Sequence, residues 1–129
     1  MTHDSRATHV PSFELELLDI EVTRAGGAVR YLEGQRYGLS TSAYHSQVPS
    51  GFGPPPHRHP YAEVFVLHDG EGRYRIEDEI IEAVAGDVVI VPPNAWHSFI
   101  NPGEGPLRQT AIHEAAVHST ERRTDAGPG

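Results

Sequence analysis

The chain has 129 residues, 37% of them hydrophobic, and a formal net charge of −8 at pH 7. This length and composition predict one globular domain. The negative charge argues against nucleic acid and anionic membranes, which favour basic patches, and the lack of cysteine excludes disulfides, thiolate metal sites and cysteine nucleophiles. No apolar run approaches the about 20 residues of a membrane helix, and no signal peptide is visible, so we expect a cytoplasmic protein.

The N-terminal part of the chain predicts an arm followed by a strand. Residues 1–12 are polar, and we expect them to form a flexible arm. Residues 13–22 nearly alternate between apolar and polar side chains, with a slip at Leu17-Leu18 that indicates a bulge. This segment begins the barrel domain, which we place at residues 13–118.

Short β-prone runs, each bounded by Gly, Pro, Asn or Asp turns, continue through the rest of the domain. The predicted strands are residues 29–32, 37–45, 63–67, 73–77, 80–84, 88–91, 95–100 and 107–113. Strands this short, with turns about every 8–12 residues, are typical of an antiparallel sandwich or barrel. Residues 114–118 fit either a last strand edge or a helical turn, and residues 119–129 have the composition of a disordered tail.

The proline-rich segment before the third of these strands carries a metal-ligand pattern. His57 and His59 are separated by one residue, so on an extended chain both imidazoles point to the same face, about 6.5–7 Å apart. Pro60 favours that extended backbone at His59, and Glu63 has the same parity. Two imidazoles and a carboxylate suit a divalent transition metal that keeps open coordination positions.

A third histidine, His97, follows a strand and a proline turn. A hairpin can bring it against the His57/His59 segment. Three neutral imidazoles and one carboxylate would leave a net charge of +1 on a bound divalent ion, with one or two positions open for chemistry.

The spacing of these residues resembles the first motif of the cupin superfamily. That motif is glycine, five residues, His-x-His, three or four residues, Glu, six residues and glycine. The chain has Gly51, His57, His59, Glu63 and Gly70 with every gap kept.

The second cupin motif is glycine, five residues, Pro-x-Gly, two residues, His, three residues and Asn. The chain has Gly86, Pro92, His97 and Asn101 in place, and departs from the motif only at Asn94, where the family has glycine. Because asparagine tolerates a left-handed backbone, we expect the turn to survive.

The resemblance covers about residues 35–113. It implies an all-β, double-stranded β-helix (jelly-roll) barrel and one divalent metal ion, Fe, Mn, Ni or Zn. The implied metal ligands are His57, His59, Glu63 and His97. It also suggests a homodimer, with residues 13–22 as the candidates for exchange between subunits.

Several other side chains are candidates for the wall of the substrate pocket. Phe65 and Phe99 share strand parity with the implied ligands, although ordinary barrel core explains them equally well. Tyr44, Gln109 and His113 are possible polar wall residues. Trp96 has the opposite parity to His97, so we expect it to pack against a neighbouring layer or subunit.

The remaining histidines carry no such pattern. Tyr44 and His45 cannot both face inward, and His68 falls at a predicted hairpin end, where we expect solvent exposure. His118 lies directly before the predicted tail, and nothing in its spacing suggests metal binding.

Three functions remain open for a metal-binding barrel of this kind. The first is dioxygenase-like chemistry on a small organic molecule such as an enol or diketone. The second is non-redox chemistry, namely isomerisation, decarboxylation, cyclisation or hydrolysis, with Glu63, Tyr44 or His113 as general acid or base. The third is a module that holds a metal or metabolite without catalysis.

Overall fold

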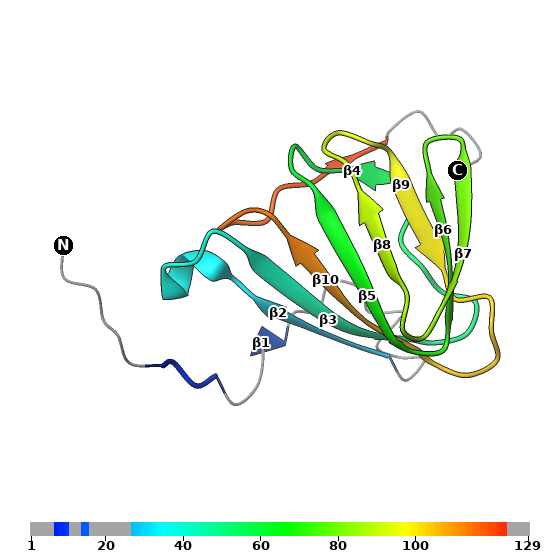
Figure 1. The fold of residues 1–129 in the computed structure, drawn as a ribbon, viewed down its shortest axis with the longest axis horizontal. Coiled ribbons are helices and arrows are strands. Elements are labelled where there is room, and N and C mark those ends of the chain that lie inside the picture. Colours follow the sequence, from blue (N-terminus) through cyan, green and yellow to red (C-terminus); the bar gives the residue numbers. More distant parts are fainter. Residues whose placement is uncertain (1–6, 11–13, 16–26, 124–129) are drawn as a thin grey trace.

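A computed structural model describes residues 7–10, 14–15 and 27–123 of the chain. Two antiparallel sheets face each other across the core of this part (Figure 1). A single 3-10 turn, η1 (Gly34–Tyr37), is the only helical element among the described residues. The all-β architecture of two antiparallel sheets is therefore confirmed. Within the described part of the chain, no helix is long and apolar enough to cross a bilayer.

The larger sheet holds six strands. In spatial order they are β1 (Glu14–Leu15), β2 (Ala28–Leu32), β3 (Ser42–Val48), β10 (Leu107–His113), β5 (Glu63–Asp69) and β8 (Val88–Val91). The smaller sheet holds five strands. They are β11 (Glu121–Arg122), β4 (His57–Arg58), β9 (His97–Ile100), β6 (Glu71–Ile76) and β7 (Glu79–Val84).

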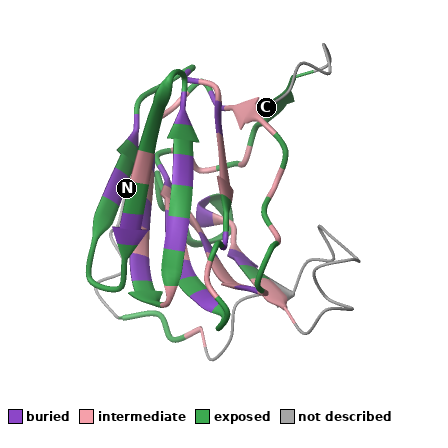
Figure 2. Ribbon diagram, turned by 90° about the vertical axis from the view of Figure 1, so that its right-hand side faces the viewer, coloured by how far each residue is buried: buried purple, intermediate pink, exposed green. Residues whose placement is uncertain are grey.

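Alternating side chains build the core between the sheets. In β6, Gly72, Tyr74 and Ile76 are buried while the residues between them are exposed, and β5 repeats this pattern of inward residues (Figure 2). This is the period of two that the sequence predicts for a half-buried strand. The buried apolar side chains are Tyr31, Tyr44, Val48, Phe65, Leu67, Tyr74, Ile76, Ala83, Val89, Val91, Ala95, Leu107 and Ala111.

Two turns depend on a left-handed backbone. Asn94 has φ +66°, so the asparagine that departs from the cupin motif adopts the conformation expected of the glycine it replaces. Gly70, between β5 and β6, has φ +84°, and a Cβ there would lie 2.4 Å from the carbonyl oxygen of Pro106. Only glycine fits that position.

Three sequence-based boundaries need correction. The strand predicted over 37–45 starts only at Ser42 and runs to Val48, because η1 and the left-handed Gly38 (φ +72°) occupy its first part. Residues 114–118 form neither a strand nor a helix. The predicted tail from 119 contains β11, which pairs with β4 through Glu121–Arg58 and Arg122–His57.

The predicted N-terminal strand, residues 13–22, is described only at β1, which pairs with β2 of the same chain. The rest of that strand, most of the predicted arm and residues 124–129 lie outside the described residues.

Candidate metal centre

Four of the predicted site residues converge between the two sheets. His57 lies in β4 and His97 opens β9, and the two are register partners. His59 follows β4, and Glu63 is the first residue of β5. One donor atom from each of these four residues lies within 4.8 Å of the others. Sequence reasoning therefore identified a real side-chain cluster, assembled from three strands and the segment that follows β4.

The backbone around the cluster fixes how the imidazoles are protonated. The Nδ1 atoms of His57, His59 and His97 lie 2.8, 2.7 and 2.9 Å from the carbonyl oxygens of Pro55, Ser119 and Ala95. A carbonyl only accepts, so each Nδ1 carries the proton and donates it. In the neutral ring, Nε2 then keeps its lone pair, which is the arrangement usual for metal-ligating histidines.

Glu63 lies at the centre of the cluster and is only 3% exposed. Its Oε1 lies 3.0 Å from Nε2 of both His59 and His97. Burial raises the pKa of this carboxyl, but the contacts with His113, His59 and His97 lower it by more, so its pKa is well below its usual range. The carboxylate is therefore ionised at neutral pH.

A cation is required to make these contacts favourable. Lone pairs on Nε2 and on the carboxylate repel each other unless a proton or a metal ion lies between them. Although His59 Nε2 is 3.0 Å from Glu63, the geometry is not that of a hydrogen bond, and this buried nitrogen has no hydrogen-bond partner. A divalent ion bound by three imidazoles and one carboxylate would satisfy all four groups, so the residues fit the implied metal.

The surroundings of His57 disfavour its protonated form. Burial, together with the neighbouring His97, lowers the pKa of His57 to about 4. His57 is therefore neutral at physiological pH and available to bind a metal.

His113, predicted as a pocket-wall residue, contacts the other oxygen of the central carboxylate. Its Nε2 lies 3.2 Å from Oε2 of Glu63, and its Nδ1 lies 2.7 Å from the hydroxyl of Tyr61. Burial raises the pKa of Tyr61 to about 12, so this hydroxyl stays protonated at neutral pH. Tyr61 was not identified from the sequence. It orients His113, and His113 orients Glu63.

The cluster opens into a cavity of about 530 Å³. All five predicted pocket residues line it: Tyr44, Phe65, Phe99, Gln109 and His113. The buried Tyr74 hydroxyl donates a hydrogen bond to Oε1 of Gln109, which fixes that amide. The strand register, which the sequence left open, thus places each of these side chains on the inner side of its sheet.

Three cavity residues were missed because they lie at or beyond the expected end of the domain, residue 118. His118, Thr120 and Arg122 all line the cavity. The rings of His118 and His59 are 5.5 Å apart, and the His118 ring lies 5.2 Å from that of His113. The available signal was the period-two spacing of 118, 120 and 122, which is too polar and too short to predict a strand.

The structure also gives the orientation of the remaining aromatic and histidine side chains considered in the sequence. Tyr44 is buried and lines the cavity, whereas His45 does not line it and has its ring 5.8 Å from that of His68. His68 is exposed, as expected. Trp96 faces outward, where the guanidinium of Arg58 lies 4.4 Å from its ring centre.

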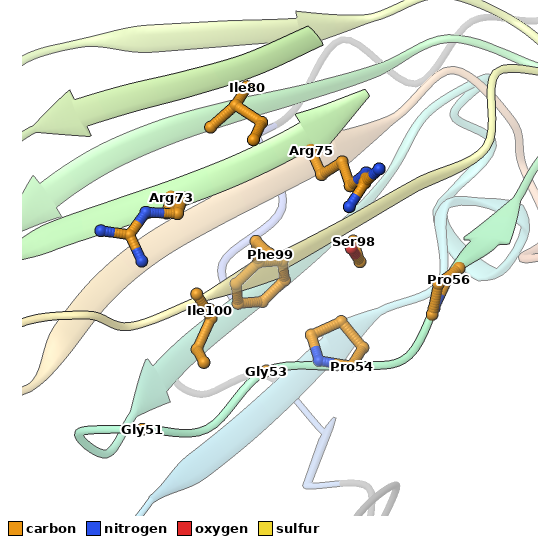
Figure 3. A pocket seen from close by; sticks show the side chains of 10 residues that line it. All are labelled: Gly51, Gly53, Pro54, Pro56, Arg73, Arg75, Ile80, Ser98, Phe99 and Ile100. Atoms are coloured by element: carbon orange, nitrogen blue, oxygen red, sulfur yellow. The ribbon is translucent and has the colours of Figure 1, made fainter. Parts of the chain in front are cut away.

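A second hollow, of about 330 Å³, opens on the outer face of β6 and β9 (Figure 3). Arg73 and Arg75, alternate residues of β6, lie on one side of it, and the loop through Pro54 lies on the other. Arg73 forms an ion pair with Glu82 at 2.6 Å. None of the four converging residues lines this hollow, so metal chemistry is assigned to the larger cavity.

Comparisons with known proteins agree with this geometry. A family model described as "Cupin domain" matches residues 44–113. Oxalate decarboxylase from Bacillus subtilis, a protein with Mn(II) centres, superposes with a TM-score of 0.69 at 21% sequence identity over 74% of this chain. The match covers 28% of the decarboxylase chain, so this chain spans only about a quarter of that enzyme.

A second solved structure is of more similar length. A cupin 2 conserved barrel domain protein from Rhodopseudomonas palustris superposes with a TM-score of 0.67 at 22% identity, over 77% of this chain and 68% of that chain. At these identities the likeness concerns the fold. No curated protein sequence matches significantly.

Proposed function

This chain belongs to the cupin family, and from that premise we propose that it is a metal-dependent enzyme acting on a small organic molecule inside the barrel. The observation that carries the proposal is the convergence of His57, His59, Glu63 and His97 on one point, with the first three of them lining a cavity. The cavity, of about 530 Å³, is in the usual range for small-molecule sites.

We assign His57, His59, Glu63 and His97 as the metal ligands. A bound ion would supply Lewis acidity and, if redox-active, a means of reacting with dioxygen. The protein residues have separate tasks. The carbonyls of Pro55, Ser119 and Ala95 hold the three imidazoles in one tautomer, and His113 holds the carboxylate.

We propose dioxygenase-like chemistry as the first reaction class. Phe65 and Phe99 give the cavity an apolar wall beside the cluster, and their rings lie 5.6 Å apart. Such a wall limits water near the site and suits the carbon skeleton of an enol or diketone. The four ligands would leave coordination positions open for a substrate and for dioxygen.

Oxygen uptake tests this class. Protein loaded with Fe(II) is mixed with a panel of β-diketones and flavonols in an oxygen electrode, and metal content is measured in parallel. We expect uptake that depends on both iron and substrate and is lost in His97→Ala. Intact iron binding without uptake across the panel would reject the dioxygenase class.

Non-redox chemistry is the second candidate, and the Tyr61–His113 pair favours it. A protonated hydroxyl 2.7 Å from an imidazole that lines the cavity is a suitable proton donor and acceptor system. This class predicts turnover with Zn(II) in place of iron and no consumption of oxygen. Tight binding of metal and ligand without conversion of the ligand would instead support the non-catalytic alternative.

We also propose a homodimer. In support, β8 is an edge strand, and Val88 and Ile90 expose 55% and 65% of their surface to solvent. Apolar side chains on a strand edge are usually covered by a partner. Light scattering after size exclusion would give the mass directly.

A further inference from the structure

The C-terminal segment, residues 118–122, forms one wall of the cavity with alternate residues, the last of which lies in β11. His118, Thr120 and Arg122 all line it, while the residues between them do not. Glu121 instead forms an ion pair with Arg58 and Arg123 lies 5.6 Å from the ring centre of Trp96, on the outer side. Because of the two-residue period, Glu121 and Arg123 face outward, whereas Arg122 is turned toward the cavity.

Arg122 is held close to the proposed metal ligands. It is the register partner of His57, the first of the four converging residues. Among the described residues, no hydrogen bond or ion pair engages its guanidinium, in contrast to Arg58, Arg73 and Arg36, each of which pairs with a carboxylate. Arg122 is also the only arginine or lysine among the described residues that line the cavity.

The charge of the cavity is opposite to that of the protein. Glu63 is the only acidic residue in the described lining, and the three histidine ligands are neutral when they bind a metal. A divalent ion with one carboxylate leaves +1, and Arg122, an exposed residue of the lining, raises this to +2, in a chain whose formal net charge is −8. A neutral ligand would gain nothing from this positive cavity, whereas an anion would be attracted and held.

A further polar position lies in the segment just before β11. The Nδ1 atom of His118 is buried without a hydrogen-bond partner in the described part of the chain, although His118 lines the cavity. Buried polar atoms normally have a partner. A ligand with polar groups at both ends would supply one.

Building on the proposed function, we propose that Arg122 binds a carboxylate of the substrate, so that the enzyme acts on a small organic acid. A guanidinium presents a planar pair of N–H donors that matches a carboxylate. One end of the acid would then lie at the metal and its charged end at the C-terminal strand. This makes Arg122 a specificity-determining residue contributed by a segment that the sequence pattern assigned to a tail.

Binding of simple diacids tests the proposal without needing the natural substrate. Zn(II)-loaded protein is titrated by calorimetry with malonate, succinate and glutarate, and with the monoamide of whichever binds best. We expect the tightest-binding diacid to bind Arg122→Gln about 10- to 100-fold more weakly than it binds the wild type. This is the range for losing one charged hydrogen-bonding group. The monoamide keeps one carboxylate, which the proposal places at the metal. It should therefore bind equally to the wild type and to Arg122→Gln.

Two neighbouring arginines provide matched controls. Arg123→Gln removes the same charge from the outer side of the strand, and Arg75→Gln removes a charge from the outer hollow. Both variants should bind the diacid as the wild type does. An equal loss in either control, unchanged binding in Arg122→Gln, or zinc binding without any diacid binding would overturn the proposal. A separate zinc titration distinguishes these outcomes from failure of the metal site itself, which would remove the premise.

Discussion

Nε2 of His113 lies 3.2 Å from Oε2 of Glu63, while the other carboxylate oxygen, Oε1, lies 3.0 Å from the imidazoles of His59 and His97. One carboxylate thus joins two environments. One oxygen faces the proposed metal ligands, and the other is tied to a histidine that is itself bonded to Tyr61. The position of the carboxylate therefore depends on residues that would not touch the ion.

Removing a histidine from the cluster should abolish metal binding without unfolding the barrel. His97→Ala or His57→Ala takes away one of the three imidazoles, but the apolar core between the sheets does not include them. We expect Zn(II) or Co(II) binding, measured by calorimetry, to fall below detection while far-ultraviolet circular dichroism stays unchanged. His68→Ala, an exposed histidine outside the cavity, is the control. Loss of the fold together with the metal would contradict this expectation.

Glu63→Gln should weaken metal binding less than loss of a histidine. The amide keeps the shape of the carboxylate and one oxygen that can bind the ion, but removes the negative charge. The measurement is the ratio of Zn(II) dissociation constants for Glu63→Gln and His97→Ala. An equal loss in both variants would show that the charge of Glu63 dominates the site.

Tyr61→Phe should lower metal affinity through His113. The variant removes the hydroxyl that lies 2.7 Å from Nδ1 of His113. Partners bonded directly to a ligand typically contribute about 10- to 100-fold to metal affinity, so this hydroxyl, which reaches Glu63 only through His113, should contribute about 10-fold or less. Tyr37→Phe, at a residue 38% exposed in η1, is the matched control and should have no effect. Identical zinc affinities in Tyr61→Phe and the wild type would mean that His113 needs no such support.

The metal-free protein should lose stability as the pH falls from about 6.5 to about 4. Burial, together with the neighbouring His97, lowers the pKa of His57 from 6.5 to about 4. In that interval the unfolded chain binds a proton that the folded chain does not, so the free energy of unfolding decreases with falling pH and is undiminished above 6.5. Urea unfolding in the presence of a chelator measures this dependence.

His57→Asn provides the comparison, because asparagine does not titrate. Its free energy of unfolding should depend less steeply on pH over the same interval, with His118, whose burial lowers its pKa to about 4, still contributing. Parallel curves for the variant and the wild type would assign the dependence to other groups.

Asn94 should tolerate glycine but not a branched residue. At φ +66° glycine is unstrained, so Asn94→Gly should change the free energy of unfolding by less than about 0.5 kcal/mol. Asn94→Val forces a β-branched residue into the left-handed region and should cost about 1–2 kcal/mol. Thermal or urea unfolding of the two variants decides the matter, and a stable Asn94→Val would imply that the turn rearranges.

The sequence by itself determined the sheet architecture and the four converging residues. The strands have a period of two and are separated by strong turn residues, so most strands can be located from the local sequence. His57, His59 and Glu63 are close in the chain, and the second motif supplied His97. The two-residue period of the strands also placed Phe65 and Phe99 on the inner face.

Only the tertiary structure decided what surrounds that cluster. His118, Thr120 and Arg122 line the cavity because β11 pairs with β4, over a separation of 63 residues between Arg58 and Glu121. No local pattern encodes such a pairing, since a two-residue polar strand gains its stability from the partner strand and not from its own sequence. The tautomers of the histidines were fixed in the same way, by carbonyl groups that the folded backbone brings to them.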